Sequence, residues 1–164
     1  MAKEVSVDAV YDSPNNLVDA FEQSVVKYPN NRLFGTKNPA SGQYEWVTFK
    51  QVADRVNNLR GALKKLGLNK GDKVGVILHN CTEWFILEQA VHGLGGVFVP
   101  MYLQELPKVI EYIVRDAEVK FLFAGHAGVY LLMNLSVLIV LYIWRRTFFV
   151  SYSVSIVFHD FLTF

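Results

Sequence analysis

Hydrophobic residues recur at helical spacing in several stretches of the chain. The clearest stretch begins at Thr48 and carries one continuous apolar stripe, made of Val52, Val56, Leu59, Leu63 and Leu66. Thr48 and Gln51 have the spacing of a capping box, and Gly67 stands where a left-handed helix end is expected. Similar patterns predict further helices over residues 16–28, 83–94 with Thr82 as the cap, and 107–117.

Short apolar runs of strand length alternate with these helices. Three of them are apolar almost throughout, at residues 74–79, 97–102 and 119–124. Such strands, separated by helices of about a dozen residues, are typical of a parallel sheet covered on both faces. Two earlier runs, 32–37 and 44–49, are joined by turn residues and predict a small hairpin. The pattern therefore predicts an α/β fold: a partial, mostly parallel sheet with flanking helices and an N-terminal hairpin, followed by an apolar tail.

The composition changes abruptly after the third apolar run. All but three of the 31 charged residues lie in residues 1–120, and none lies between Ala127 and Trp144. We therefore divide the chain into residues 1–125 and an apolar tail, 126–164. As a helix, 127–144 would span about 27 Å, close to the thickness of a bilayer core. The tail is interpreted as a membrane anchor, as a buried continuation of the sheet, or as sequence foreign to the fold, and the abrupt change favours the last.

Charge and cysteine content exclude some classes of function. The net charge of +1 argues against a nucleic-acid partner, because little positive charge is available to neutralise phosphates. The single cysteine, Cys81, excludes an internal disulfide framework. The N-terminus has no apolar segment of signal-peptide length, so we expect a cytoplasmic protein or one on the cytosolic face of a membrane.

The candidate chemical motifs favour structural roles. The glycines of GLGG at 93–96 follow a helix, whereas a phosphate cradle precedes one, so they indicate a helix stop. The stretch GTKNPASG at 35–42 lies within the hairpin and is interpreted as a turn. His79 stands at a strand end, where ligand clefts form in α/β folds, but a structural role is favoured. The histidines and Cys81 show no metal-ligand spacing. No catalytic, cofactor-binding or metal-binding residue is predicted.

A family resemblance covers most of the region before the tail. It rests on the run RVNNLRGALKKLGLNKGDKVGVILHNCTEWFILEQAVHGLGGVFVPMYLQ and on IEYIVRDAEVKFLFA after it. These residues strongly resemble the N-terminal region of long-chain fatty-acid–CoA ligases, which belong to the adenylate-forming, or AMP-binding, superfamily. The resemblance runs from about Asn16 to Ala124 and is lost in the apolar tail.

The resemblance implies a reaction in two steps. The family activates a fatty acid with ATP and Mg²⁺ to an acyl adenylate, and then transfers the acyl group to coenzyme A. In the family, the loop that holds the phosphates and the catalytic lysine lie downstream of the matched region, so we expect this chain to be an N-terminal fragment that is inactive alone. The strand at 119–124 is then expected to have one unpaired, apolar edge. The alternative is a non-enzymatic α/β interaction module associated with a membrane through 127–144.

Overall fold

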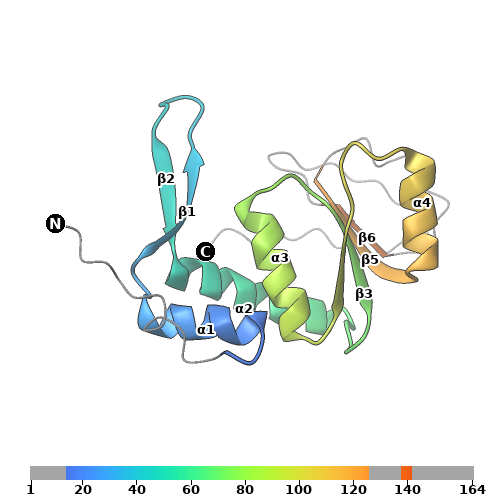
Figure 1. Cartoon of the computed structure of the whole chain (residues 1–164), viewed down its shortest axis with the longest axis horizontal. Helices are drawn as coiled ribbons and strands as arrows, with labels where there is room; N and C mark the ends of the chain where they lie inside the picture. The colour runs from blue at the N-terminus through green and yellow to red at the C-terminus, as the bar shows by residue number, and fades with distance from the viewer. Residues whose placement is uncertain (1–13, 126–137, 142–164) are drawn as a thin grey trace. The chain divides into compact units, whose positions relative to one another are not determined.

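The computed structural model describes residues 14–125 and 138–141. The chain divides into two compact units, residues 1–55 and 56–164, and each unit is described separately. From α1 to β5 the elements follow one another as the sequence pattern predicts, and β6 is an additional strand (Figure 1). Their order and bounds are α1 (Leu17–Lys27), β1 (Arg32–Lys37), β2 (Tyr44–Thr48), α2 (Phe49–Lys65), β3 (Lys73–Ile77), α3 (Thr82–Gly93), β4 (Val97–Pro100), α4 (Pro107–Asp116), β5 (Val119–Ala124) and β6 (Leu138–Leu141).

The first unit contains the predicted helix and hairpin. Asn16 caps α1, where its side-chain oxygen accepts a hydrogen bond from the Asp19 N–H at 2.9 Å. Strands β1 and β2 pair in an antiparallel hairpin. The predicted turn closes it through paired backbone bonds, in which Gly42 N–H donates to the Asn38 carbonyl and Asn38 N–H donates to the Gln43 carbonyl, each at 2.8 Å.

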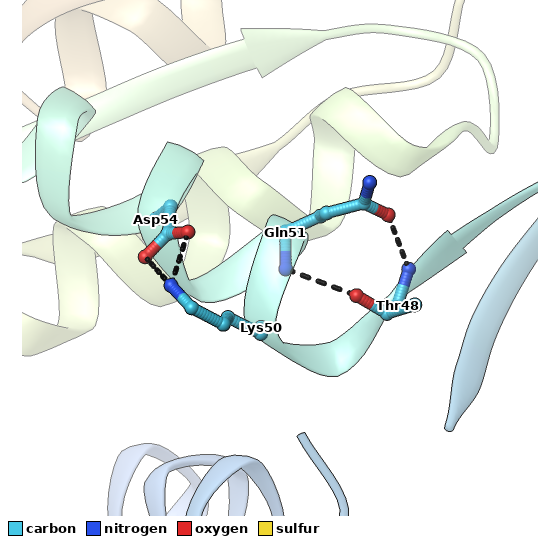
Figure 2. A network of polar contacts seen from close by, with 4 residues as sticks. All are labelled: Thr48, Lys50, Gln51 and Asp54. Carbon is cyan, nitrogen blue, oxygen red and sulfur yellow. Dashed lines mark hydrogen bonds and ion pairs between the residues drawn. The ribbon is translucent and has the colours of Figure 1, made fainter. Parts of the chain in front are cut away.

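The start of α2 has the predicted capping box, which Figure 2 shows. Thr48 N–H donates to Gln51 Oε1 at 2.8 Å, and Gln51 N–H donates to Thr48 Oγ1 at 3.3 Å. One turn along, Lys50 Nζ contacts Asp54 Oδ2 at 2.8 Å on the exposed surface. The helix ends at Lys65, and Gly67 follows with φ of +88°, the left-handed conformation that glycine adopts most readily. The sequence therefore specifies both ends of this helix.

The second unit is built on a parallel sheet in the order β4-β3-β5-β6. Val74 of β3 is in register with Phe98 of β4 and Phe121 of β5, and Gly75 is in register with Val99 and Leu122. Because side chains alternate along a strand, these two rows lie on opposite faces of the sheet. This topology confirms the predicted α/β fold with a mostly parallel sheet.

Helices α3 and α4 cover the two opposite faces. On one face, the ring of Trp84 in α3 meets the ring of Phe98 edge-on, with centroids 5.0 Å apart. On the other face, α4 contributes Ile110 and Val114 to a buried cluster with Ile77, Leu122 and Ala124. Figure 1 shows the two helices flanking the strands. The sheet is therefore buried on both sides, as its apolar strands predict.

Two sequence expectations need correction in this part of the chain. The strand at 119–124 does not have the predicted free edge, because β6 pairs with β5 in parallel, from Phe121 opposite Leu138 to Ala124 opposite Leu141. The cap of α3 is Cys81, and Thr82 is already its first helical residue. Such a one-residue shift is ordinary for a helix boundary.

The strand β6 also bears on the apolar tail. Residues 138–141 lie inside the span 127–144 that was considered as a membrane helix, and they form a strand that continues the sheet. The rest of that span, 127–137 and 142–144, lies outside the described residues. No helix within the described ranges is long and apolar enough to cross a bilayer. An uncharged run alone does not distinguish a strand from a membrane helix.

Candidate functional site

The carboxyl ends of the parallel strands form the candidate site. In open α/β sheets, ligands bind beyond these ends, at the point where successive connections leave in opposite directions. After β3 the chain forms β4, which lies on one side of β3. It then forms β5, which lies on the other side of β3. The switch point therefore lies between the ends of β3 and β5, and the residues that follow these two strands are the ones to consider.

Backbone hydrogen bonds hold this edge of the sheet together. Gly125 N–H donates to the Ile77 carbonyl at 3.0 Å, which joins the ends of β5 and β3. Met101 N–H donates to the Val76 carbonyl at 2.8 Å and does the same for β4 and β3. A Cβ added to Gly125 would lie only 2.6 Å from Leu78 Cδ2, so a side chain at this position would collide with Leu78. These backbone hydrogen bonds hold the carboxyl ends of β3, β4 and β5 together.

The polar side chains at this edge come from the segment between β3 and α3. His79 lies beyond the end of β3, as predicted, and is exposed. Cys81 caps α3 and is half-buried. Burial raises the pKa of the Cys81 thiol, although the nearby backbone N–H of Trp84 acts in the opposite direction. The thiol is therefore protonated at neutral pH, and a protonated thiol is a poor nucleophile.

The described residues do not fit a metal ion. Within 14–125 and 138–141, no three His, Cys, Asp or Glu side chains gather as potential ligands. His92 instead packs its ring against Phe98, with centroids 6.0 Å apart. His126 and His159 lie outside the described residues.

The opposite, amino-terminal edge of the sheet carries an electrostatic cluster. Lys120 Nζ donates to Asp72 Oδ2 at 2.6 Å and to the Gly67 carbonyl at 2.8 Å. Asp72 Oδ2 also accepts the Asn69 N–H at 2.7 Å. The Lys120 hydrogen bond, followed by that from Asn69, lowers the pKa of Asp72 below its ordinary value. This cluster ties the α2–β3 turn to β5, and its charges satisfy one another, so its role is structural.

The glycine motifs behave as the sequence indicates. GLGG ends α3, where Gly95 has φ of +71° and Gly96 N–H donates to the Val91 carbonyl at 2.9 Å. GTKNPASG contributes the end of β1 and the hairpin turn. Neither precedes a helix N-terminus in the manner of a phosphate cradle. Within the described residues, the polar side chains between β3 and α3 are those of His79, Asn80 and Cys81, and no phosphate-binding loop accompanies them.

Comparison with known proteins assigns the chain to a family. The family model described as AMP-binding enzyme matches residues 21–141. Long chain acyl-CoA synthetase 5 of Arabidopsis thaliana is 38% identical over 108 residues, which cover 64% of this chain and 16% of that protein. Long chain acyl-CoA synthetase 3 of the same plant is 36% identical over 71% of this chain and 18% of its own length. Long-chain-fatty-acid–CoA ligase 1 of Cavia porcellus is 33% identical over 70% and 16%, respectively.

Solved structures agree on the fold. The anthranilate CoA ligase AuaEII, in complex with anthranoyl-AMP, superposes with a TM-score of 0.68 at 28% identity, over 77% of this chain and 25% of that one. The N-terminal subdomain of NpsA from Klebsiella oxytoca superposes with a TM-score of 0.58 at 20% identity, over 68% and 28%, respectively, and supports the fold alone.

The extent of the family match locates its boundaries in this chain. The match continues through residue 141 and so includes β6, beyond Ala124, where the sequence resemblance was expected to end. The assignment of residues 142–164 stays a prediction. The chain spans less than a fifth of the length of the three curated relatives named above. With about three-quarters of its residues inside the match, the chain belongs to the AMP-binding enzyme family.

Proposed function

We propose that this chain provides part of the sheet scaffold of a long-chain acyl-CoA ligase. The observation that carries the proposal is the family match, which spans the parallel sheet from β3 to β6, together with relatives whose names are long-chain acyl-CoA synthetases. The substrates would be a long-chain fatty acid, ATP and coenzyme A. A location on the cytosolic side of the cell stays a prediction.

The reaction makes demands that can be compared with the residues present. In the first step a fatty-acid carboxylate attacks the α-phosphorus of ATP, and pyrophosphate leaves. In the second step the thiol of coenzyme A attacks the acyl carbonyl, and AMP leaves. Both steps need fixed groups that bind phosphate oxygens and stabilise developing negative charge. The sequence contains no glycine- and serine-rich loop with a lysine that precedes a helix, which is the usual means of holding a polyphosphate.

The scaffold would act through position. Its strands β3 and β5 meet at the switch point, and the bond at Gly125 joins their carboxyl ends. The bond at Met101 joins the ends of β4 and β3 in the same way. A nucleotide-binding edge needs such a rigid base, because misplacement by even an ångström is costly in catalysis. We infer that the 164-residue polypeptide supplies this base and does not form acyl adenylate by itself.

ATP–pyrophosphate exchange tests the inference directly. The purified 164-residue chain is incubated with palmitate, Mg²⁺, ATP and labelled pyrophosphate, beside a full-length Arabidopsis long-chain acyl-CoA synthetase as the positive control. We expect incorporation of label into ATP at the level of the protein-free blank. Exchange above that level which depends on palmitate would contradict the inference, because it requires a complete adenylation centre.

A further inference from the structure

The hairpin has its two large aromatic side chains on an exposed face. Tyr44 and Trp46 alternate along β2 and therefore share one face, and 58% and 47% of their surfaces are exposed. Their ring centroids lie 6.0 Å apart. The opposite face carries Phe34 and Val47, which are partly buried. The larger rings thus lie on the more exposed face of the hairpin, where about half of each side chain is open to a partner.

The exposed face is also cationic. Lys37 is paired with Tyr44 across the strands, so its side chain lies on the same face. The guanidinium of Arg32 lies over the Trp46 ring, 5.3 Å from its centroid. The hairpin's one acidic residue, Glu45, is on the other face, where Asn38 Nδ2 donates to its carboxylate at 2.6 Å. We call Arg32, Lys37, Tyr44 and Trp46 the hairpin patch.

Gly35 allows this arrangement. It lies opposite Trp46 in the strand register, and a Cβ added there would lie 2.9 Å from each of three atoms of the six-membered ring of Trp46. The six-membered ring of Trp46 therefore lies across the backbone of β1 at Gly35. Held in this way, Trp46 loses little conformational freedom when a partner covers it.

We propose that the hairpin patch binds the surface of an anionic phospholipid membrane. Tryptophan and tyrosine are enriched at membrane–water interfaces, since an apolar ring and a polar tip suit the headgroup region. Lysine and arginine near that surface are attracted by acidic lipids. A bilayer complements both properties of the patch, the positive charge and the flat aromatic rings.

The size of the patch distinguishes a membrane from a protein partner. A stable protein interface takes about 20–30 residues on each side, and the hairpin patch has only four side chains. A bilayer surface has no such minimum, and weak, reversible association needs only a few interfacial residues. The proposal does not depend on the proposed ligase function, because vesicle binding requires no catalysis.

Vesicle sedimentation tests the proposal. The full chain is mixed with vesicles of phosphatidylcholine alone, or with vesicles in which about a third of the lipid is phosphatidylserine. The bound fraction is measured in the pellet. We expect stronger binding to the acidic vesicles and a decrease at high salt. The double variant Arg32→Gln/Lys37→Gln should bind acidic vesicles at least about tenfold more weakly, because each cation contributes about fivefold. Trp46→Ala should weaken binding to both kinds of vesicle.

Matched variants elsewhere on the chain separate the patch from the apolar tail. Tyr112→Ala removes an exposed tyrosine of α4, as Tyr44→Ala removes one from the patch, and Lys64→Gln/Lys108→Gln removes two exposed cations outside it. We expect these controls to bind as the unaltered chain does. Circular dichroism checks that every variant is folded. If Trp46→Ala unfolds the hairpin, the double charge variant still tests the patch, because it retains Trp46.

Three results would overturn the proposal. One is the absence of sedimentation with acidic vesicles. Another is equal binding by the hairpin variants and the controls, which would assign binding to another segment. The third is retention of a single-stranded oligonucleotide by the patch in the same buffer without vesicle binding, because exposed rings beside cations also suit unstacked bases.

Discussion

Lys120 illustrates what local sequence patterns reveal about single residues and what they do not. Gly67 was predicted as a helix end because its signal is local, and its φ of +88° confirms it. The sequence did not indicate that its carbonyl accepts a hydrogen bond from Lys120, 53 positions along the chain, or that Lys120 also binds Asp72, 48 positions away. Gln89 was likewise unmarked, yet it is buried, and its Oε1 has no hydrogen-bond partner among the described residues. Such features depend on tertiary contacts.

The Lys120–Asp72 contact leads to a prediction about pH. Because the pKa of Asp72 is lower in the folded chain than its ordinary value of 3.8, folding favours the ionised carboxylate. This contribution to stability is fully present above pH 3.8 and is lost as the pH falls through the lower, folded pKa. At pH 7, Asp72→Asn should decrease the free energy of unfolding by less than about 1 kcal/mol, since the Lys120 side chain is 43% exposed.

Urea unfolding of the two proteins at a series of pH values checks this prediction. The difference in free energy between the unaltered chain and Asp72→Asn should be constant near neutrality and should diminish below pH 3.8. Glu118→Gln removes the acidic partner of another exposed ion pair, with Lys73, and serves as a control. A difference that grows on acidification would show that the sign is wrong.

At the scale of elements, periodicity was sufficient for the helices and for the first five strands. Each has its own signal: an apolar stripe with caps for α2, a proline in the first turn of α4, and apolar runs for β3 to β5. β6 could not be predicted in the same way, because it lies within a long uncharged run that has no helical or alternating period. The candidate site followed from topology, whereas the strand register that places Gly125 beside Ile77 had no signal in the sequence.

The capping box permits a prediction about α2. Thr48→Ala and Gln51→Ala each remove one side-chain bond to an otherwise free N–H at the helix start (Figure 2). Each should decrease the free energy of unfolding by about 1 kcal/mol. The double variant should lose less than the sum, because the two side chains form one reciprocal unit.

Lys50→Ala provides the matched control at the same helix end. It removes an exposed i,i+4 ion pair with Asp54 and should cost only a few tenths of a kcal/mol, about 0.3 kcal/mol. Thermal or urea denaturation of the four variants and the unaltered chain separates the two effects. Equal losses for Lys50→Ala and Thr48→Ala would mean that the capping box contributes no more than a surface ion pair.

For the whole molecule, β6 decides whether the apolar strand β5 is paired on both sides. Residues 1–125 retain β5 but lack β6, so a chain that ends there presents unpaired backbone groups along Val119–Ala124. An exposed apolar strand of this kind favours association with other chains. We expect the 1–125 protein to aggregate, and we expect a 1–141 protein, which keeps β6, to be better behaved.

Light scattering and thermal denaturation of the two truncated proteins test this expectation. The 1–141 protein should give the smaller particles and the sharper unfolding transition. A monodisperse 1–125 monomer that unfolds cooperatively would show that β6 is dispensable.

The strand order β4-β3-β5-β6 has a consequence for the folding of the protein during its synthesis on the ribosome. Among the described strands of this sheet, β3 is synthesised first and β6 is synthesised last. The 17 residues from Gly125 to Leu141 take about 1–3 s to translate. During that interval the edge of β5 that pairs with β6 is unpaired in the nascent chain. We expect a chaperone to bind the nascent chain most readily in this interval.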